Sequence, residues 1–130
     1  MRLKRRKGQA LIETIVGLFI FVPVVLFLID VIAMVMAQTA NDALAKDCAR
    51  AAAEEVDQAA AQTSVNQVKV NFSSPVLRIN SVNVTAYSDE TVTVVTNATF
   101  TFPVQIPMFG VSTQEFAATA TEPVVGKLSN

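Results

Sequence analysis

The residues whose types and spacing suggest chemistry are Gly8 and Glu13, at the start of a long apolar run. A carboxylate placed in hydrocarbon costs roughly 2.5–3.5 kcal/mol, so Glu13 needs a cation beside it. A peptidase at the membrane surface could hydrolyse the peptide bond after Gly8, where the absent side chain permits close approach to the backbone. The new amine on Gln9 would lie one helical turn from Glu13, or beside Glu13 of a neighbouring subunit. We therefore expect hydrolysis of this chain, followed by ion pairing that sets subunit register.

No pattern in the sequence suggests catalysis, a metal site or a cofactor. Histidine is absent, and the one cysteine, Cys48, has no general base near it in the sequence. The acid pairs Glu54–Glu55 and Asp89–Glu90 are typical of solvated surface, and neither a Gly-rich loop nor a metal-ligand spacing occurs. We predict that the protein is not an enzyme and binds no nucleic acid and no small-molecule substrate. Cys48 is predicted to be a small buried thiol, with an intermolecular disulfide as the alternative.

The elements that must position Gly8 and Glu13 begin with a membrane helix. The stretch "IVGLFIFVPVVLFLI" contains no charged side chain, and the wider run 10–37 is interrupted by Glu13, Thr14 and Asp30. Its residues, about 28 of them, extend roughly 42 Å as a helix, which exceeds the ~30 Å hydrocarbon core. The sequence therefore predicts a transmembrane helix over residues 9–37.

Three residues of this helix have further predicted roles. Pro23 is expected to kink the helix without ending it, because proline is tolerated in transmembrane helices. Asp30 either marks the outer membrane boundary or makes a packing or subunit contact. For Glu13, the alternative to a subunit contact is a carboxylate that simply reaches the lipid headgroups.

The distribution of charge predicts the orientation of the span. Five of the ten basic residues lie in the first seven positions, whereas the chain beyond them carries five bases and eleven acids. A basic N-terminal end favours the cytoplasmic side, so the C-terminal domain is predicted to be exported from the inner (cytoplasmic) membrane. A cleaved secretory signal is the alternative, since "AMVMAQTA" has small residues at suitable spacing.

Residues 38–63 predict an exported continuation of the same helix. The segment is rich in Ala, Lys, Glu and Gln and contains neither Gly nor Pro. Its apolar residues recur at intervals of three and four, which places them on one face. They are Leu44, Cys48, Ala52, Val56 and Ala59 or Ala60.

Residues 64–130 predict a small antiparallel β domain, so the fold class is α+β. Apolar residues alternate with polar ones from about residue 66. The alternating sets are Val68, Val70 and Phe72, then Val82, Val84 and Ala86, then Val92, Val94, Ala98, Phe100 and Phe102. We expect a hairpin turn at "YSDE", a bulge at Asn80–Ser81 and an edge strand at "EFAATATEPVV". Because 65 or so residues of sheet bury little by themselves, the exported half of the helix is expected to complete the core.

Two prolines are expected to interrupt the strand pairing before that last strand. Pro103 and Pro107 have no N–H to donate to a ladder. The "PMFG" stretch is then expected to form a loop tip that contacts either another subunit or the helix.

The leader "KRRKGQALIE" resembles that of type IV prepilins. The wider pattern resembles the TadE-like minor pilins and pseudopilins of tight-adherence pilus systems. The matching residues are Gly8, Gln9, Ala10, Leu11, Glu13, Pro23, Asp30, the "CARAAA" stretch around Arg50 and the ending "ATATE". The chain departs from the family after Asp30, where Val31, Ile32 and Ala33 replace the usual aromatic, Gly and Arg.

The resemblance implies a pilin-like fold in which residues 1–8 are a basic leader. It further implies cleavage after Gly8 by a prepilin peptidase, methylation of the new amine on Gln9, and a role for Glu13 in filament assembly. The implied function is that of a minor pilin or pseudopilin that initiates or supports pilus assembly. Its implied partners are the prepilin peptidase, other pilin subunits, the inner-membrane assembly platform and the lipid bilayer, with an extracellular pilus as the destination after assembly.

Two alternative functions stay open from the sequence. One is a major filament subunit, which filament-level abundance would favour. The other, of a different class, is an uncleaved single-span anchor that holds a periplasmic interaction module. Retention of residues 1–8 in the mature protein would favour this anchor.

Overall fold

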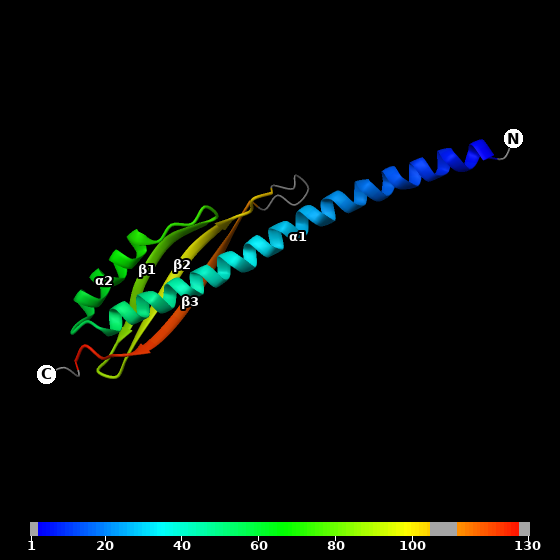
Figure 1. Ribbon diagram of the computed structural model, residues 1–130. Helices are drawn as coiled ribbons and strands as arrows, with labels where there is room; N and C mark the ends of the chain where they lie inside the picture. Colours follow the sequence, from blue (N-terminus) through cyan, green and yellow to red (C-terminus); the bar gives the residue numbers. More distant parts are fainter. Residues whose placement is uncertain (1–2, 105–111, 128–130) are drawn as a thin grey trace.

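The structure is a long helix whose distal half packs against a small sheet. The computed structural model describes residues 3–104 and 112–127, with side chains from residue 8 onward. Its elements are α1 (Leu3–Ala53), α2 (Gln58–Asn71), β1 (Leu77–Tyr87), β2 (Thr91–Thr101) and β3 (Thr113–Pro123). Figure 1 shows the first half of α1 projecting as a free rod from a head formed by the other elements. The predicted α+β class is confirmed.

The projecting part of α1 ends at Asp30. The helix is unbroken through Pro23, and no side chain from residue 8 to residue 29 is buried. These residues extend about 33 Å at 1.5 Å per residue, and α1 is long and apolar enough to cross a membrane. The head reaches Asp30, seven residues before the predicted end of the span at residue 37. The kink at Pro23 stays a prediction.

The prediction of one helix through residue 63 is wrong, because α1 ends at Ala53 and a second helix begins at Gln58. Two sets of hydrogen bonds define the turn between them. The carbonyl of Ala53 accepts hydrogen bonds from the distant Val125 and Gly126 N–H groups, at 2.9 and 3.0 Å. Asp57 then caps α2, since its Oδ1 accepts from the Ala60 N–H at 2.8 Å. As a result Val56, which was predicted on the buried face, is 58% exposed.

The strand expected near residues 68–72 is instead the end of α2, which continues to Asn71. Val68 and Val70 alternate with polar residues, but only Val68 packs against the core, and Val70 is exposed. The residues that pack inward are spaced by four, three and four, which is the helical period. They are Ala61, Val65, Val68 and Phe72.

The three strands form an antiparallel sheet in the order β1-β2-β3, so β3 is an edge strand as predicted. Tyr87 and Thr91 bound the predicted hairpin turn, and the register shifts between Ile79 and Ser81, where a bulge was expected. A second shift, between Val84 and Ala86, was not expected. It turns Ala86 to the exposed side of the sheet, contrary to the predicted alternation.

The segment after β2 is described in part. Pro103 lies beyond the end of β2, so the predicted interruption is confirmed there. Pro107 and the "PMFG" loop tip lie outside the described residues.

Both helices cover the same face of the sheet. α1 lies against β2 and β3, whereas α2 lies against β1. Small residues dominate the α1 side of this core, and β2 contributes the larger side chains opposite them. The buried residues are Ala37, Leu44, Ala45, Cys48, Ala49, Ala52 and Ala53 from α1, with Val92, Val94, Ala98 and Phe100 from β2. The prediction that the exported half of the helix completes the core is confirmed.

Polar side chains fix the helices on the sheet. Asn41 of α1 is buried, and its Oδ1 accepts a hydrogen bond from the Thr96 hydroxyl at 3.0 Å. Gln62 of α2 pairs with the edge of β1, because its Nε2 donates to the Val82 carbonyl at 3.0 Å and its Oε1 accepts from the Val84 N–H at 2.9 Å. The β1 edge is thereby partly covered by a helix, which limits its pairing with other strands.

The segment after β3 closes the end of the head. Gly126 packs so tightly on the turn after α1 that an added Cβ would lie 2.3 Å from the Glu54 carbonyl oxygen and 2.6 Å from that of Glu55. The adjacent Lys127 ammonium pairs with Asp89 in the hairpin turn at 2.5 Å. The C-terminal segment therefore joins the end of α1 to the β1–β2 turn.

A substitution at Gly126 tests this closure. Gly126→Ala should lower the free energy of unfolding by about 1–3 kcal/mol, because the methyl group must displace the backbone of the turn. Urea unfolding of the full chain in detergent measures the change. Gly17→Ala is the matched control, since an added Cβ there has no atom within 4 Å. Equal stability of the two variants would contradict the close contact.

Candidate assembly interface

The predicted processing residues lie on the part of α1 furthest from the head. Gly8, Gln9 and Glu13 are all exposed, and an added Cβ at Gly8 meets no atom within 4 Å. The bond after Gly8 lies inside α1, so a peptidase must unwind the first turns before it can cut. Glycine lowers the cost of that unwinding, because it is a poor helix former.

Glu13 has no cation beside it among the described side chains. The one ion pair that they form within 4.0 Å joins Lys127 to Asp89, at the opposite end of the molecule. Leu11, Ile12 and Ile15, which surround Glu13, are more than half exposed apolar side chains. The carboxylate thus projects from a mainly apolar part of α1.

Asp30 lies at the other end of the rod, where α1 enters the head. It is about 26 Å from Glu13 along the helix axis. Its side chain is buried, and its Oδ1 accepts a hydrogen bond from the Val104 N–H at 3.1 Å. Of the roles predicted for Asp30, packing within the chain is therefore the one observed. The bond ties the segment that follows β2 to α1.

Beyond Asp30, α1 has one buried face and one exposed face. The exposed face is defined here by apolar residues near the rod and by charged residues further on. Its apolar part is Ile32, Val35 and Met36, and its charged part is Asp42, Lys46, Asp47, Arg50 and Glu54, the last directly after α1. None of these five charged side chains forms an ion pair within the described residues.

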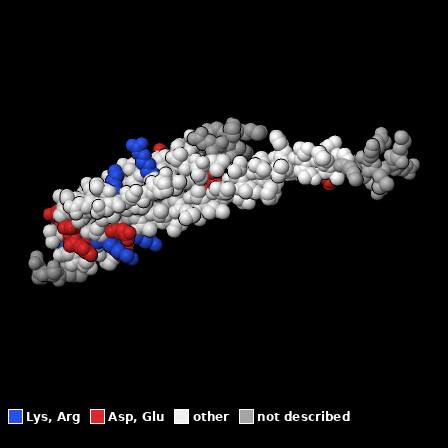
Figure 2. All heavy atoms as spheres, turned by 45° about the horizontal axis from the view of Figure 1, so that its top comes forward, with Lys and Arg blue, Asp and Glu red and all other residues white. Residues whose placement is uncertain are grey.

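This charged set is not among the residues predicted from the sequence. The signal was available, because acids and bases recur at intervals of four from Asp42 to Glu54. Figure 2 shows that charged side chains gather on the head, whereas the described part of the projecting rod carries one acidic spot. Glu13 is the one charged residue between positions 8 and 29.

Cys48 is buried among the small residues of α1, as predicted. Burial raises the pKa of its thiol to about 11, and the nearby negative charge of Asp47 adds to this shift. A thiol with so high a pKa is a poor nucleophile at neutral pH.

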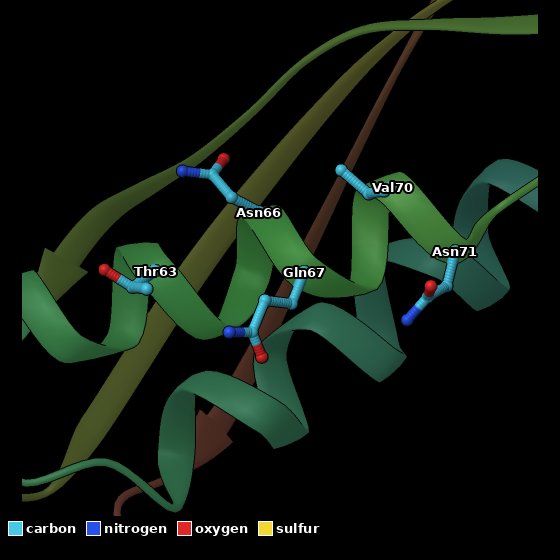
Figure 3. Close-up of a pocket in the computed structure, with 5 residues that line it drawn as sticks. All are labelled: Thr63, Asn66, Gln67, Val70 and Asn71. Atoms are coloured by element: carbon cyan, nitrogen blue, oxygen red, sulfur yellow. The ribbon is translucent and has the colours of Figure 1, made fainter.

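No group of three or more potential metal ligands occurs among the described residues. The hollow drawn in Figure 3 is a shallow depression along α2, lined by Thr63, Asn66, Gln67, Val70 and Asn71. Asn66 and Val70 project to one side of α2 and Gln67 and Asn71 to the other, and none of the five lining side chains is charged. The absence of enzymatic activity stays a prediction.

Comparison of the chain with protein-family models, curated proteins and solved structures found no match. The resemblance to TadE-like pilins therefore rests on the matching sequence residues alone, which lie in the leader, in α1 and in the "ATATE" ending.

Substitution of Asp30 tests its contact with Val104. Asp30→Ala should lower the free energy of unfolding by roughly 1.5–3 kcal/mol, because the Val104 N–H loses a charged acceptor. Asp30→Asn keeps an acceptor oxygen and should cost less. Urea unfolding measures both variants, and hydrogen exchange should be faster at Val104 in the alanine variant. Unchanged exchange there would contradict the bond.

The raised pKa of Cys48 predicts both its reactivity and a pH dependence. At pH 8 about one thiol in a thousand is ionised, so the folded protein should resist maleimide until urea unfolds it.

Since the unfolded thiol loses its proton near pH 9.0 and the folded one near 11, the free energy of unfolding should fall as pH rises from 9 to 11. Cys48→Ala is the control that should remove this part of the pH dependence. Rapid labelling of the folded chain would contradict the burial.

Proposed function

We propose that this chain is a pilin-like assembly subunit that is cleaved after Gly8 and packs with other subunits through α1. Before assembly it lies in the inner membrane, with the leader in the cytoplasm and the head exported. After assembly it is part of the pilus. The observation that carries the proposal is Glu13, a carboxylate five residues after Gly8 on an apolar rod, with no cation beside it among the side chains described from residue 8 onward. Such a group is costly in lipid unless an assembly partner supplies a cation.

The continuity of α1 supports this proposal. One helix forms both the apolar rod and the α1 side of the head core, so subunits that pack through their rods also bring their heads together. The new amine on Gln9 would lie at the end of the rod, within one turn of Glu13. The cation beside Glu13 would then be the amine of its own chain or that of a neighbouring copy.

We favour a minor pilin or pseudopilin of a tight-adherence pilus, on the resemblance of the leader and of the "CARAAA" stretch. The major subunit is the second candidate, and the uncleaved anchor is the candidate of another class. The two pilin candidates share the cleavage and the role of Glu13, whereas the anchor needs neither. Measurements on residues 1–13 therefore separate the two classes.

The intact mass of the membrane-extracted chain, with and without a co-expressed prepilin peptidase, tests the proposal. We expect the loss of residues 1–8 and the gain of one methyl group only when the peptidase is present. Gly8→Leu should keep the precursor mass, because a bulky side chain obstructs access to the bond. Glu13→Ala should still be cleaved but should fail to enter sheared filaments, and Glu13→Asp should retain part of that incorporation.

Other outcomes would overturn the proposal. An unchanged precursor mass with the peptidase present would favour the uncleaved anchor. A cut near residue 37 would favour a secreted head released from a signal. Normal incorporation of Glu13→Ala would leave cleavage in place and remove the role of Glu13.

A further inference from the structure

We propose that the exposed face of α1 beyond Asp30 is a contact surface for a second copy of this chain, displaced by about eight residues along the helix axis. This inference rests on the proposed function and adds to it the register in which heads pack. The displacement corresponds to about 12 Å at 1.5 Å per residue. Copies inserted in one membrane with the same orientation have parallel α1 helices, so when these faces are turned toward each other the contact is described by one axial displacement.

The charged part of the face consists of residues on one side of the helix. Asp42, Lys46, Arg50 and Glu54 follow one another at intervals of four and form a single row. Asp47 lies beside this row. All five side chains are exposed, and the described residues supply none of them with an ion-pair partner. Along the row the charges are negative, positive, positive and negative. The two adjacent positive charges, Lys46 and Arg50, decide which displacement is favourable.

Two copies at the same level would place each of the five charges against its own like. A displacement of four residues pairs Asp42 with Lys46 and Arg50 with Glu54, but it also places Lys46 against Arg50. A displacement of eight pairs Asp42 with Arg50 and Lys46 with Glu54, and it creates no like pair among the five. A displacement of twelve places Asp42 against Glu54. Eight is therefore the displacement within the row at which attraction is unopposed.

The apolar part of the face agrees with the same displacement. Ile32, Val35 and Met36 are 60%, 56% and 67% exposed, although the opposite side of the helix is already covered by the head. At a displacement of eight residues they lie level with positions 24, 27 and 28 of the second copy. Those positions are Val24, Phe27 and Leu28, which are themselves about half exposed. Apolar side chains of one copy thus contact apolar side chains of the other, and the charged parts of the two faces contact each other further toward the C-terminal end of α1.

Disulfide trapping in membranes tests the displacement with the full chain. Two differently tagged copies are co-expressed, one carrying Val35→Cys and the other Ala43→Cys, because these exposed positions are eight residues apart. Under mild oxidation, the mixed 35–43 dimer should form about fivefold faster than the 43–43 dimer in the same sample. The parent chain, whose Cys48 is buried, is the control for background cross-linking. A Thr39→Cys and Ala43→Cys pair samples the displacement of four.

Charge reversal supplies the matched variants. Asp42→Arg places a base at position 42 of one copy against Arg50 of the other, so the 35–43 cross-link should slow several-fold. Arg50→Asp should have the same effect, by placing two acids together. The double variant Asp42→Arg/Arg50→Asp has the parent composition and restores opposite charges at the same displacement, so it should recover the parent rate. Urea unfolding of each variant checks that the head is intact.

The outcomes separate this inference from the proposed function. Faster 43–43 or 39–43 trapping, or a rate unaffected by Asp42→Arg, would overturn the displacement of eight and leave self-association standing. Failure to trap any pair would overturn the inference and also weigh against assembly through α1. Cleavage after Gly8 is measured independently of the trapping, so a normal mature mass with no trapped dimer would favour a different partner at this face.

Discussion

The head depends on contact between the sheet and α1, because a three-stranded sheet cannot bury its own apolar face. Most of that face is covered by small side chains of α1, among them Ala45, Cys48 and Ala49. Small residues let the helix backbone approach the sheet closely, so Val94 and Phe100 of β2 become fully buried. Without α1 these residues would be exposed to water, and an isolated sheet of this size would be marginal. The rod and the head are therefore parts of one folded unit.

The same helix meets two different surroundings, and Asp30 lies at the change between them. From residue 8 to residue 29 the side chains of α1 are apolar on every side, apart from Gln9, Glu13 and Thr14. From Asp30 onward one side is buried in the head and the other becomes charged. In the described structure α1 runs as one helix from Leu3 to Ala53 and passes through Pro23 without a break between its two halves. Any tilt of the rod is passed directly to the head.

Local sequence patterns predicted the elements whose cause is local. The apolar run gave the rod, and strict alternation located β2 together with the hairpin turn that precedes it. The bulge near Asn80 was predicted from a phase change between Ile79 and Val82, which is also a local signal. Gly8 and Glu13 were found from spacing alone, and the structure shows them exposed on the rod.

The elements that were missed have causes elsewhere in the chain. α1 ends at Ala53 because residues 125 and 126 donate to its last carbonyl, and no pattern near Ala53 records this. The nearest local signal was Asp57, a good N-cap residue, which was not used. The stretch from Val65 to Phe72 fits both a strand and a helix, and packing on the sheet decided between them. The contact of Asp30 with Val104 also joins residues far apart in the sequence.

The cap on α1 has a consequence for the order of events during synthesis. Val125 follows Ala53 by 72 residues (125 minus 53), so the groups that cap the helix are translated well after it. At the usual 5–20 residues per second this delay is roughly 4–14 seconds. During that interval α1 has an uncapped end and no sheet to pack against, while its apolar rod is already complete. Closure of the head therefore comes after the rod is complete, and the rate of translation sets the interval between the two.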